Sequence, residues 1–463
     1  MRETFKVISP IDNHVYVELE RHNDKDIENA VQNAVNAQAS WKNTPLADRI
    51  SIVKKFAEAI QNDSERISEE LCWQMGRPIR YAPGEVRGTI ERTLGMVDLA
   101  ESALADIAVA EKPGFTRFIK REPLGVVFVV PAWNYPYLIA VNSIVPALLA
   151  GNAVILRHSA QTPLVAERFA DAFKKAGLPQ HLFQVLHLSH KDTARVIRDH
   201  RVQFVAFTGS VQGGYDIKKV AQERFIGVGL ELGGKDPAYV CEDTPFDFTV
   251  ENLVDGAFFN SGQSCCGIER IYVHHAVYQK FVEAFVDLTK KYKLNNPMKE
   301  ETTIGPMAKQ SGADFLKKQI REAIEAGAEA LIKPSLFPET ELGNNYCAPQ
   351  VLVNVDHSMS FMIDESFGPA VGIMSVESDA EAIRLMNDSP YGLTASIWTD
   401  SEDRALTIGD QIDTGTWFMN RCDYLDPYLA WVGVKDSGHG CTLSRVGFEQ
   451  LTRPKSYHLR VKI

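Results

Sequence analysis

Two adjacent thiols, Cys265 and Cys266, stand just after the turn that Gly262 introduces at the end of an apolar run. A nucleophilic cysteine needs such a placement, because a tight turn exposes the sulfur to a pocket while the flanking structure holds it still. The alternative is a pair of ordinary buried cysteines, since free cysteine is among the most buried residue types. The stretch therefore predicts either thiol chemistry or a structural pair, and other segments must decide between them.

Two further side chains suit the chemistry of a thiol nucleophile. Glu231 closes an apolar run just before Gly233, where desolvation would raise the pKa of its carboxyl toward neutrality, as a general base requires. It could equally cap the turn or pair with Lys235. Asn134 could direct an amide N–H at a developing oxyanion, although an asparagine near a proline is often only part of a turn.

A turn of small residues offers a possible phosphate site. Gly209, Ser210 and Gly214 follow a predicted strand and open a predicted helix. Small residues free the backbone N–H groups to meet a phosphate at the helix N-terminus, and the Ser210 hydroxyl adds a donor. The pattern differs from the G-x-G-x-x-G fingerprint, so a plain strand-to-helix turn is the alternative.

Composition narrows the class of protein. With 49 basic and 60 acidic residues, the net charge of −11 argues against nucleic acid or an anionic membrane as the main partner. The seven cysteines show neither a disulfide framework nor a zinc-binding pattern, so no metal is expected. The N-terminus lacks the apolar core of a signal peptide, and the apolar stretch 138–156 is interrupted by Pro146 and Gly151. These features predict a cytoplasmic protein without a membrane span.

The elements that must position the candidate residues change character along the chain. Its 463 residues are enough for two or three domains. Helical periodicity dominates the first quarter, with predicted helices at 24–40, 44–60, up to 75, and 85–106. An exposed strand at 116–122 and a buried strand at 126–130 follow, and strands then alternate with helices as far as 231. This alternation predicts a doubly wound parallel sheet, whose ligands bind beyond the carboxyl ends of the strands.

A second α/β unit is predicted from Asp236 onward, with strands at 269–273, 350–353, 370–376 and 394–398. The tail 446–463 returns to an alternating pattern that is typical of an exposed strand. Such an edge seeks a partner, and we expect it to pair with the strand 116–122 of another subunit.

Several motifs, taken together, resemble the aldehyde dehydrogenase superfamily in order and spacing, and they cover nearly the whole chain. They are Trp133-Asn134, Gln161-Thr162-Pro163, Phe207–Ser210, Glu231–Lys235, Gly262-Gln263-x-Cys265, Glu365–Pro369 and Lys435-Asp436-Ser437-Gly438-x-Gly440. The resemblance implies two doubly wound α/β domains, one Rossmann-like and one catalytic, with a small β oligomerisation arm. The implied ranges are 1–103 and 124–233 for NAD(P) binding, 234–442 for catalysis, and 104–123 and 443–463 for the arm. It also implies a homodimer or homotetramer.

The same resemblance assigns roles to residues. It implies oxidation of an aldehyde to a carboxylic acid with NAD or NADP, without acylation of coenzyme A. Cys265 would be the nucleophile and not Cys266, because the family's cysteine is the second residue after Gln263. Asn134 would hold the oxyanion, and Glu231 would activate water to hydrolyse a thioester. The implied cofactor contacts are Trp133, Arg157, Ser159, Gly209, Ser210, Gly214, Leu232, Glu365 and Phe367, and the implied substrate mouth is Tyr135, Tyr137, Ser264, Cys266 and Tyr424.

Two departures from the family pattern bear on specificity. Arg157-His158-Ser159-Ala160 stands where Lys-Pro-Ser-Glu is usual. Ala160 removes a carboxylate that repels a 2′-phosphate, and Arg157 keeps a cation with a fork that suits phosphate. We therefore expect NADP to be accepted at least as well as NAD, unless Arg157 is only a structural cation. Cys441-Thr442 replaces Arg-Glu near the substrate mouth.

The substrate and two rival functions stay open at this stage. The aromatic content of the loop 421–428 fits an apolar or aromatic aldehyde, whereas Asp423 and Asp426 fit an aminoaldehyde equally well. Transfer of the acyl group to coenzyme A is one rival, and Glu231 counts against it. A binding or structural protein that has lost turnover is the other, and the filled catalytic positions count against that.

Overall fold

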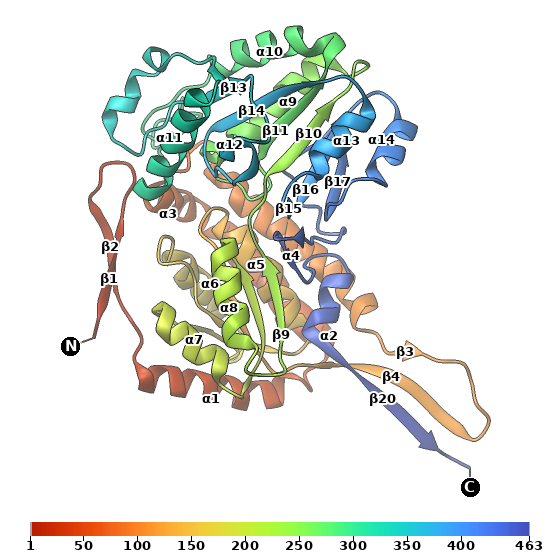
Figure 1. Ribbon diagram of the computed structural model, residues 1–463. Helices are drawn as coiled ribbons and strands as arrows, with labels where there is room; N and C mark the ends of the chain where they lie inside the picture. Colours follow the sequence, from red (N-terminus) through yellow and green to blue (C-terminus); the bar gives the residue numbers. More distant parts are fainter. Residues whose placement is uncertain (1, 463) are drawn as a thin grey trace.

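The computed structural model describes residues 2–462, which form two α/β units and a projecting β arm (Figure 1). The first unit is built on a six-stranded sheet in the order β19-β9-β8-β5-β6-β7. Its parallel strands are β5 (Val126–Val130), β6 (Ala153–Leu156), β7 (Phe183–Val185), β8 (Val202–Thr208) and β9 (Gly227–Glu231). The sixth strand, β19 (Gly438–His439), runs antiparallel to β9. Residues 438–439 thus belong to the sheet of the first unit, although the range 234–442 was expected to form the second.

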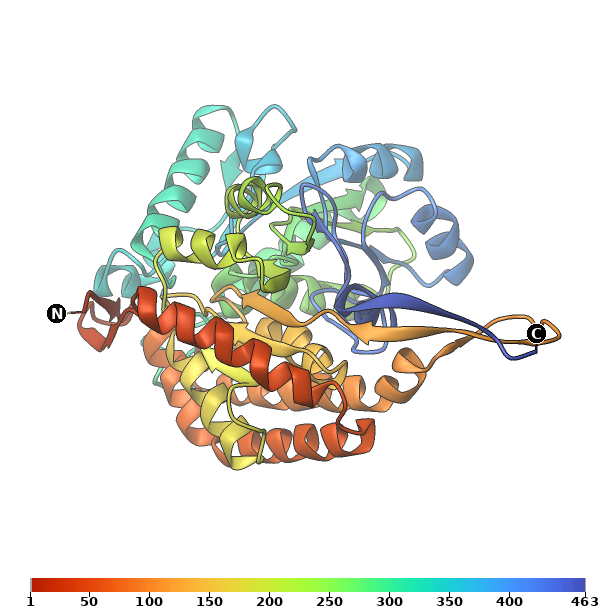
Figure 2. The same cartoon turned by 90° about the horizontal axis from the view of Figure 1, so that it is seen from below.

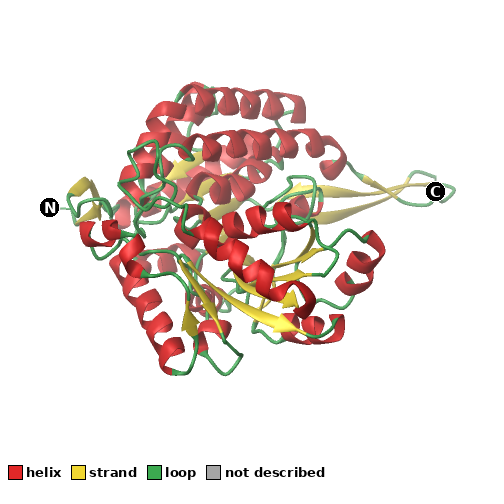
Figure 3. Cartoon of the chain, turned by 90° about the horizontal axis from the view of Figure 1, so that it is seen from above, coloured by secondary structure: helices red, strands yellow, loops and turns green. Residues whose placement is uncertain are grey.

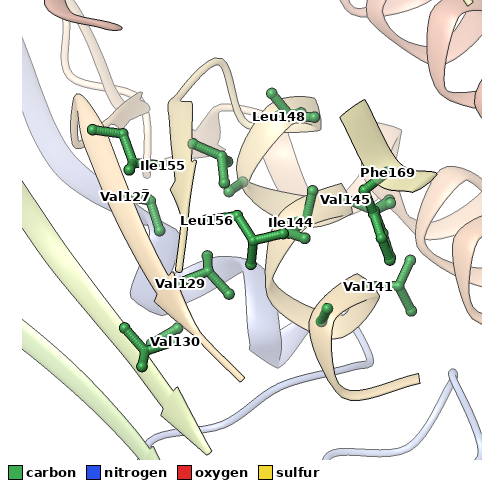
Figure 4. Close-up of a cluster of buried hydrophobic side chains, with 14 of the residues drawn as sticks. Val127, Val129, Val130, Val141, Ile144, Val145, Leu148, Ile155, Leu156 and Phe169 are labelled. Carbon is green, nitrogen blue, oxygen red and sulfur yellow. The ribbon is translucent and has the colours of Figure 1, made fainter. Parts of the chain in front are cut away.

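The apolar runs of these strands are buried against helices. Figure 4 shows Val127 and Val129 of β5 and Leu156 of β6 on the side of the sheet that faces Ile144 and Leu148 of α5. Both faces of these strands are buried, which is why their apolar runs are continuous and do not alternate with polar residues. The helices of this unit are α1 (Asp24–Trp41), α2 (Leu46–Asn62), α3 (Ser64–Met75), α4 (Ala82–Leu104), α5 (Pro136–Leu149), α6 (Leu164–Lys175), α7 (His190–Arg198) and α8 (Val211–Ala221).

The second unit has a seven-stranded sheet in the order β12-β13-β14-β11-β10-β16-β17. Helices surround the strands of both units (Figure 3). The strands are β10 (Asp236–Val240), β11 (Ile268–His274), β12 (Glu329–Ala330), β13 (Gln350–Val353), β14 (Ala370–Val376), β16 (Thr394–Trp398) and β17 (Thr416–Met419). The helices are α9 (Phe246–Phe258), α10 (His275–Thr289), α11 (Gln310–Glu325), α12 (Ser360–Ile363), α13 (Asp379–Asn387) and α14 (Glu402–Gly409). These two mixed α/β units confirm the predicted fold class.

The arm corrects one prediction. Strand β20 (Thr452–Arg460) pairs antiparallel along its length with β4 (Phe115–Pro123) of the same chain, not of another subunit. The short strand β3 (Ile107–Ala108) completes this sheet, which projects from the body (Figure 2). Stacking of Phe118 on Tyr457, with ring centroids 4.6 Å apart, reinforces the pairing.

The sequence analysis missed several elements. They include the hairpin of β1 (Thr4–Ile8) with β2 (Val15–Glu20) and the pair of β15 (Tyr391–Gly392) with β18 (Val434–Lys435).

No described helix is long and apolar enough to cross a membrane. Within residues 2–462, no cluster of three or more His, Cys, Asp or Glu side chains could hold a metal ion.

Candidate active site

The topology of the first sheet creates a crevice beyond the ends of β5 and β8. Strand β5 pairs with β6 on one side and with β8 on the other. The connections that follow β5 and β8 therefore run in opposite directions, and the carboxyl ends of these two strands separate. Ligands of doubly wound sheets bind at such a switch point. The residues that follow β5 include Trp133 and Asn134, and those that follow β8 are Gly209 and Ser210.

The turn before the two thiols is held in an unusual conformation. Asn260, Ser261 and Gly262 have positive φ angles of 53°, 57° and 68° in succession. A side chain at Gly262 would lie 2.2 Å from the carbonyl oxygen of Gly368, so only glycine fits there. Gln263 locks the turn, because its amide donates to the Asn260 carbonyl at 3.0 Å and its Oε1 accepts from the Ala308 N–H at 2.9 Å. The backbone thus fixes where Cys265 stands.

Cys265 lies in the walls of two cavities. The larger, of about 450 Å³, is lined by Cys265, Glu231 and residues of α4, α5, α9 and the loop 422–425. The smaller, of about 180 Å³, is lined by Cys265 together with Asn134, Ser210 and Glu365. One partly exposed sulfur can therefore contact a molecule on either side.

Cys266 differs from its neighbour in surroundings. It is buried and lines only the larger cavity, where its Sγ donates to Asp423 Oδ1 at 3.0 Å. Hydrogen bonding to Cys265, burial and the charge of Asp423 raise the pKa of Cys266 well above its ordinary value. Since the thiolate is the reactive form, this shift makes Cys266 a poor nucleophile.

Glu231 forms another part of the larger cavity, at the carboxyl end of β9. The hydroxyls of Thr208 and Thr442 donate to its two carboxylate oxygens at 3.2 and 2.5 Å. Burial raises the pKa of Glu231, and these two hydrogen bonds oppose that shift. A raised pKa makes the ionised carboxylate a stronger base, which suits removal of a proton from water.

Asn134 is fixed from both sides. Its Nδ2 donates to the Gln263 carbonyl at 3.3 Å, and its own carbonyl accepts from Arg77 at 2.5 Å and from Asn260 at 3.2 Å. At 3.3 Å the hydrogen bond from the Asn134 side-chain amide is long and therefore weak. The amide can turn toward an oxygen bound beside Cys265 without losing a strong contact.

Sequence reasoning missed the buried ion pair that supports this arrangement. Arg77 pairs with Glu85 and also donates to Asn260 Oδ1 at 3.2 Å. Glu85 in turn accepts from the Tyr137 N–H at 2.9 Å, at the first turn of α5. Neither residue carries a motif. Only their burial, which depends on contacts far apart in the sequence, distinguishes them from surface charges.

Glycines and the N-terminus of a helix border the smaller cavity. A side chain at Gly233 would lie 2.4 Å from the Glu365 carboxylate, and one at Gly209 would lie 2.7 Å from the Phe207 ring. Glycine at both positions leaves the backbone open to a ligand. Ser210 begins α8 as its N-cap, with its Oγ accepting from the Gly213 N–H at 3.2 Å, so the helix N-terminus faces an anion site.

The remaining predicted cofactor residues divide into those that line this cavity and those that do not. Trp133, Leu232, Glu365 and Phe367 line it, and the Trp133 and Phe367 rings meet edge to face at 5.6 Å. Burial and then the charge of Glu269 raise the pKa of Glu365 to about 8. Arg157, Ser159 and Gly214 lie outside its wall.

The residues predicted to form the substrate mouth divide between the larger cavity and the core. Tyr135, Ser264, Cys266 and Tyr424 line the larger cavity. Tyr137 does not, because its ring is 1% exposed and stacks on Phe169 in the core at 5.5 Å. The side chain of Tyr137, one residue into α5, turns inward and away from the cavity. Asp426 also lies outside the wall, and its Oδ1 accepts from the Tyr428 N–H at 2.8 Å.

Comparisons with known proteins agree with this geometry. The model of the aldehyde dehydrogenase family matches residues 1–457. The 3,6-anhydro-alpha-L-galactose dehydrogenase of Vibrio sp. (strain EJY3) is 30% identical over 98% of this chain and 95% of its own length. The NAD(P)+ succinate semialdehyde dehydrogenase Sad of Escherichia coli is 31% identical over 92% of this chain and 91% of its own. A solved succinic semialdehyde dehydrogenase from Streptococcus pyogenes, in complex with NADP+, has a TM-score of 0.94 and 27% identity, covering 98% of this chain and 100% of that one. The chain belongs to the aldehyde dehydrogenase family.

Proposed function

We propose that this protein oxidises an aldehyde to a carboxylic acid, with NAD or NADP as the hydride acceptor. The observation that carries the proposal is the position of Cys265 in the walls of both cavities. One cavity can hold the aldehyde and the other the dinucleotide, so that a single sulfur lies between them. The named relatives that act on aldehydes, with NAD(P)+ or NADP+, support this assignment.

The residues suggest how the reaction proceeds. The Cys265 sulfur forms a bond to the aldehyde carbon, and the Asn134 amide with the Cys265 N–H stabilises the negative oxygen. A bound dinucleotide supplies the acceptor for the hydride, which leaves a thioester on Cys265. Glu231 then removes a proton from water, whose oxygen bonds to the acyl carbon. The carbon–sulfur bond breaks, which releases the acid and restores the thiolate. Because Glu231 lines the same cavity as Cys265, water is favoured over coenzyme A as the acyl acceptor.

The direct test supplies the purified protein with aldehydes of graded size and charge and with each dinucleotide. We expect reduced dinucleotide and carboxylic acid in equal amounts, without added thiol. Formation of neither product from any aldehyde would contradict the proposed function. Dependence of turnover on coenzyme A would show acyl transfer instead.

The pH dependence of hydrolysis is expected to respond to Thr442. Burial raises the pKa of Glu231, and the hydrogen bond from Thr442 lowers it, so Thr442→Val should raise it further. Glu231 acts as a base only when ionised, and its ionised fraction grows as pH rises through its pKa. The rising limb of kcat against pH should therefore move to higher pH in Thr442→Val and stay in place in Thr442→Ser. A limb that does not move in Thr442→Val would show that the hydroxyl has no influence on the base.

Cofactor choice is expected to depend on a pair of like charges. Arg157 is partly buried and Lys309 is exposed overall, yet local desolvation of its ammonium and then the charge of Arg157 lower the pKa of Lys309. Burial lowers the pKa of Arg157 to about 10, so the group stays charged at neutral pH. The Lys309 ammonium lies 5.6 Å from the centre of the Trp133 ring, which borders the smaller cavity. Two neighbouring cations favour a bound phosphate, and Ala160 adds no acid.

We therefore expect kcat/KM with NADP to equal or exceed that with NAD. Ala160→Glu should reduce kcat/KM for NADP by ~10-fold or more, because it places a carboxylate where the 2′-phosphate would lie, and should spare NAD. Ala160→Gln, which has the same size without the charge, is the control. A wild-type preference for NAD of ~100-fold would contradict the prediction.

A further inference from the structure

One buried guanidinium faces the larger cavity without an acidic partner. Arg92, on α4, is 8% exposed and lines the cavity. Its Nη1 donates to the Leu138 carbonyl at 3.0 Å and to Asn142 Oδ1 at 3.3 Å, both on α5. Among residues 2–462, no carboxylate lies within 4.0 Å of Arg92, whereas Arg77 of the same cavity is paired with Glu85.

A buried charge without a partner is costly, and it persists where a ligand supplies the opposite charge. Burial lowers the pKa of Arg92 to about 10, so the group is still a cation at neutral pH. Its Nε and Nη2 donate to no protein group in the part of the chain that the structure describes. Part of the guanidinium fork is therefore available to a molecule in the cavity.

The acids that share this cavity are engaged or lie toward its exposed side. Asp423 Oδ1 accepts from the Ser264 hydroxyl at 2.9 Å and from Cys266 at 3.0 Å. Glu91 accepts from the Tyr424 hydroxyl at 2.9 Å, and Asp255 is exposed. Glu231 is held by its two threonines. The buried acids thus accept hydrogen bonds at their carboxylate oxygens, whereas Nε and Nη2 of Arg92 have no acceptor among the described residues. The unused hydrogen-bonding capacity belongs to a cation, which favours an anionic group over the ammonium of an aminoaldehyde.

We infer that Arg92 binds a carboxylate at the far end of the substrate, so that the preferred substrates are aldehydes carrying a second, anionic end. The inference rests on the proposed oxidation at Cys265. Arg92, Cys265, Cys266 and Glu231 all line the larger cavity, so the four groups surround one space of about 450 Å³. A guanidinium binds a carboxylate through two parallel N–H bonds, and this geometry would direct the aldehyde end away from Arg92 and toward the sulfur.

The test compares three series of straight-chain aldehydes of matched length, with a methyl, a carboxylate or an ammonium group at the far end. For the wild type we expect kcat/KM to be ~10-fold to ~100-fold higher for the carboxylates than for the methyl series, as a charged hydrogen-bonded pair requires. Arg92→Met, which keeps the length of the side chain, should lose this preference, so that kcat/KM falls by a much larger factor for the carboxylates than for the methyl series. Arg92→Lys should keep part of it. Arg87→Met, which removes an exposed arginine of the same cavity, should keep all of it.

A second measurement does not depend on turnover. Straight-chain dicarboxylates, which have no aldehyde to oxidise, should raise the Tm of the wild type and of Arg87→Met but not that of Arg92→Met. A wild-type preference for the methyl or ammonium series would overturn the inference, and so would an equal loss for all three series in Arg92→Met. If no aldehyde is oxidised but dicarboxylates still stabilise the protein through Arg92, the proposed function fails and the anion site stands. If Arg92→Met does not fold, the inference is tested by the preference of the wild type among the three series and by the partial loss of that preference in Arg92→Lys.

Discussion

Cys265→Ser is expected to abolish aldehyde oxidation, whereas Cys266→Ser should retain most of it. A serine hydroxyl is almost fully protonated at neutral pH, so removal of the thiol should reduce kcat by ~10⁴-fold or more, as for other covalent nucleophiles. Of the two cavities, Cys266 lines only the larger. Its thiol donates a hydrogen bond to Asp423, and the pKa of the thiol is raised. Its loss removes a wall contact and not the reacting sulfur.

The measurement is the initial rate of NAD(P)H formation for both variants under saturating aldehyde and dinucleotide. Thermal unfolding of each variant serves as the control for folding, and binding of the dinucleotide should persist in both. If Cys266→Ser loses activity and Cys265→Ser keeps it, the assignment of the nucleophile is wrong.

Glu231→Gln is expected to separate the two halves of the reaction. The carboxamide keeps the size of the side chain but cannot take a proton, so attack by water on the thioester should slow by ~10²-fold to ~10⁴-fold. Formation of the thioester does not use this base. A rapid burst of NAD(P)H, close to one equivalent per Cys265, should therefore precede a slow steady rate.

Rapid mixing resolves the burst, and mass spectrometry of the quenched protein should find the acyl group on Cys265. The pH profile gives an independent check. Because the pKa of Glu231 is raised by burial, wild-type hydrolysis should increase with pH above the ordinary range of a glutamate, and Glu231→Gln should lack that rising limb. A variant without a burst and without an acyl adduct would show that Glu231 acts before the thioester forms.

Arg77 connects Asn134 to the turn that precedes Cys265. Its guanidinium joins the carbonyl of Asn134 to the side chain of Asn260, and Glu85 ties it to the start of α5. Partners 57 and 183 positions away are held by one side chain. A buried side chain with several fixed partners keeps the geometry of a site within the narrow limits that catalysis requires.

The sequence determined the elements whose signal is local. The strands of the first sheet are continuous apolar runs between helices of regular period, and these patterns depend only on neighbouring residues. Family motifs around Glu231 and Cys265 added the family and its expected chemistry. Strand β10 was missed because Pro237 lies inside it, and proline counts against a strand in a sequence reading. The hairpin β1–β2 carries a short alternating pattern, with Phe5 and Val7 buried between exposed neighbours, so a signal for it was present in the sequence.

The tertiary structure alone decided which charges are buried and which partners they have. Thr442 meets Glu231 across 211 positions. Strand β20 pairs with β4 of its own chain, from Thr452 opposite Pro123 to Arg460 opposite Phe115. Tyr137 was predicted to face the substrate but packs in the core, whereas Arg92 carries no motif and lies in the cavity wall. The side-chain pattern of a segment gives its secondary structure. The burial of one residue depends on which distant segments pack against it, and that information is set by the whole chain.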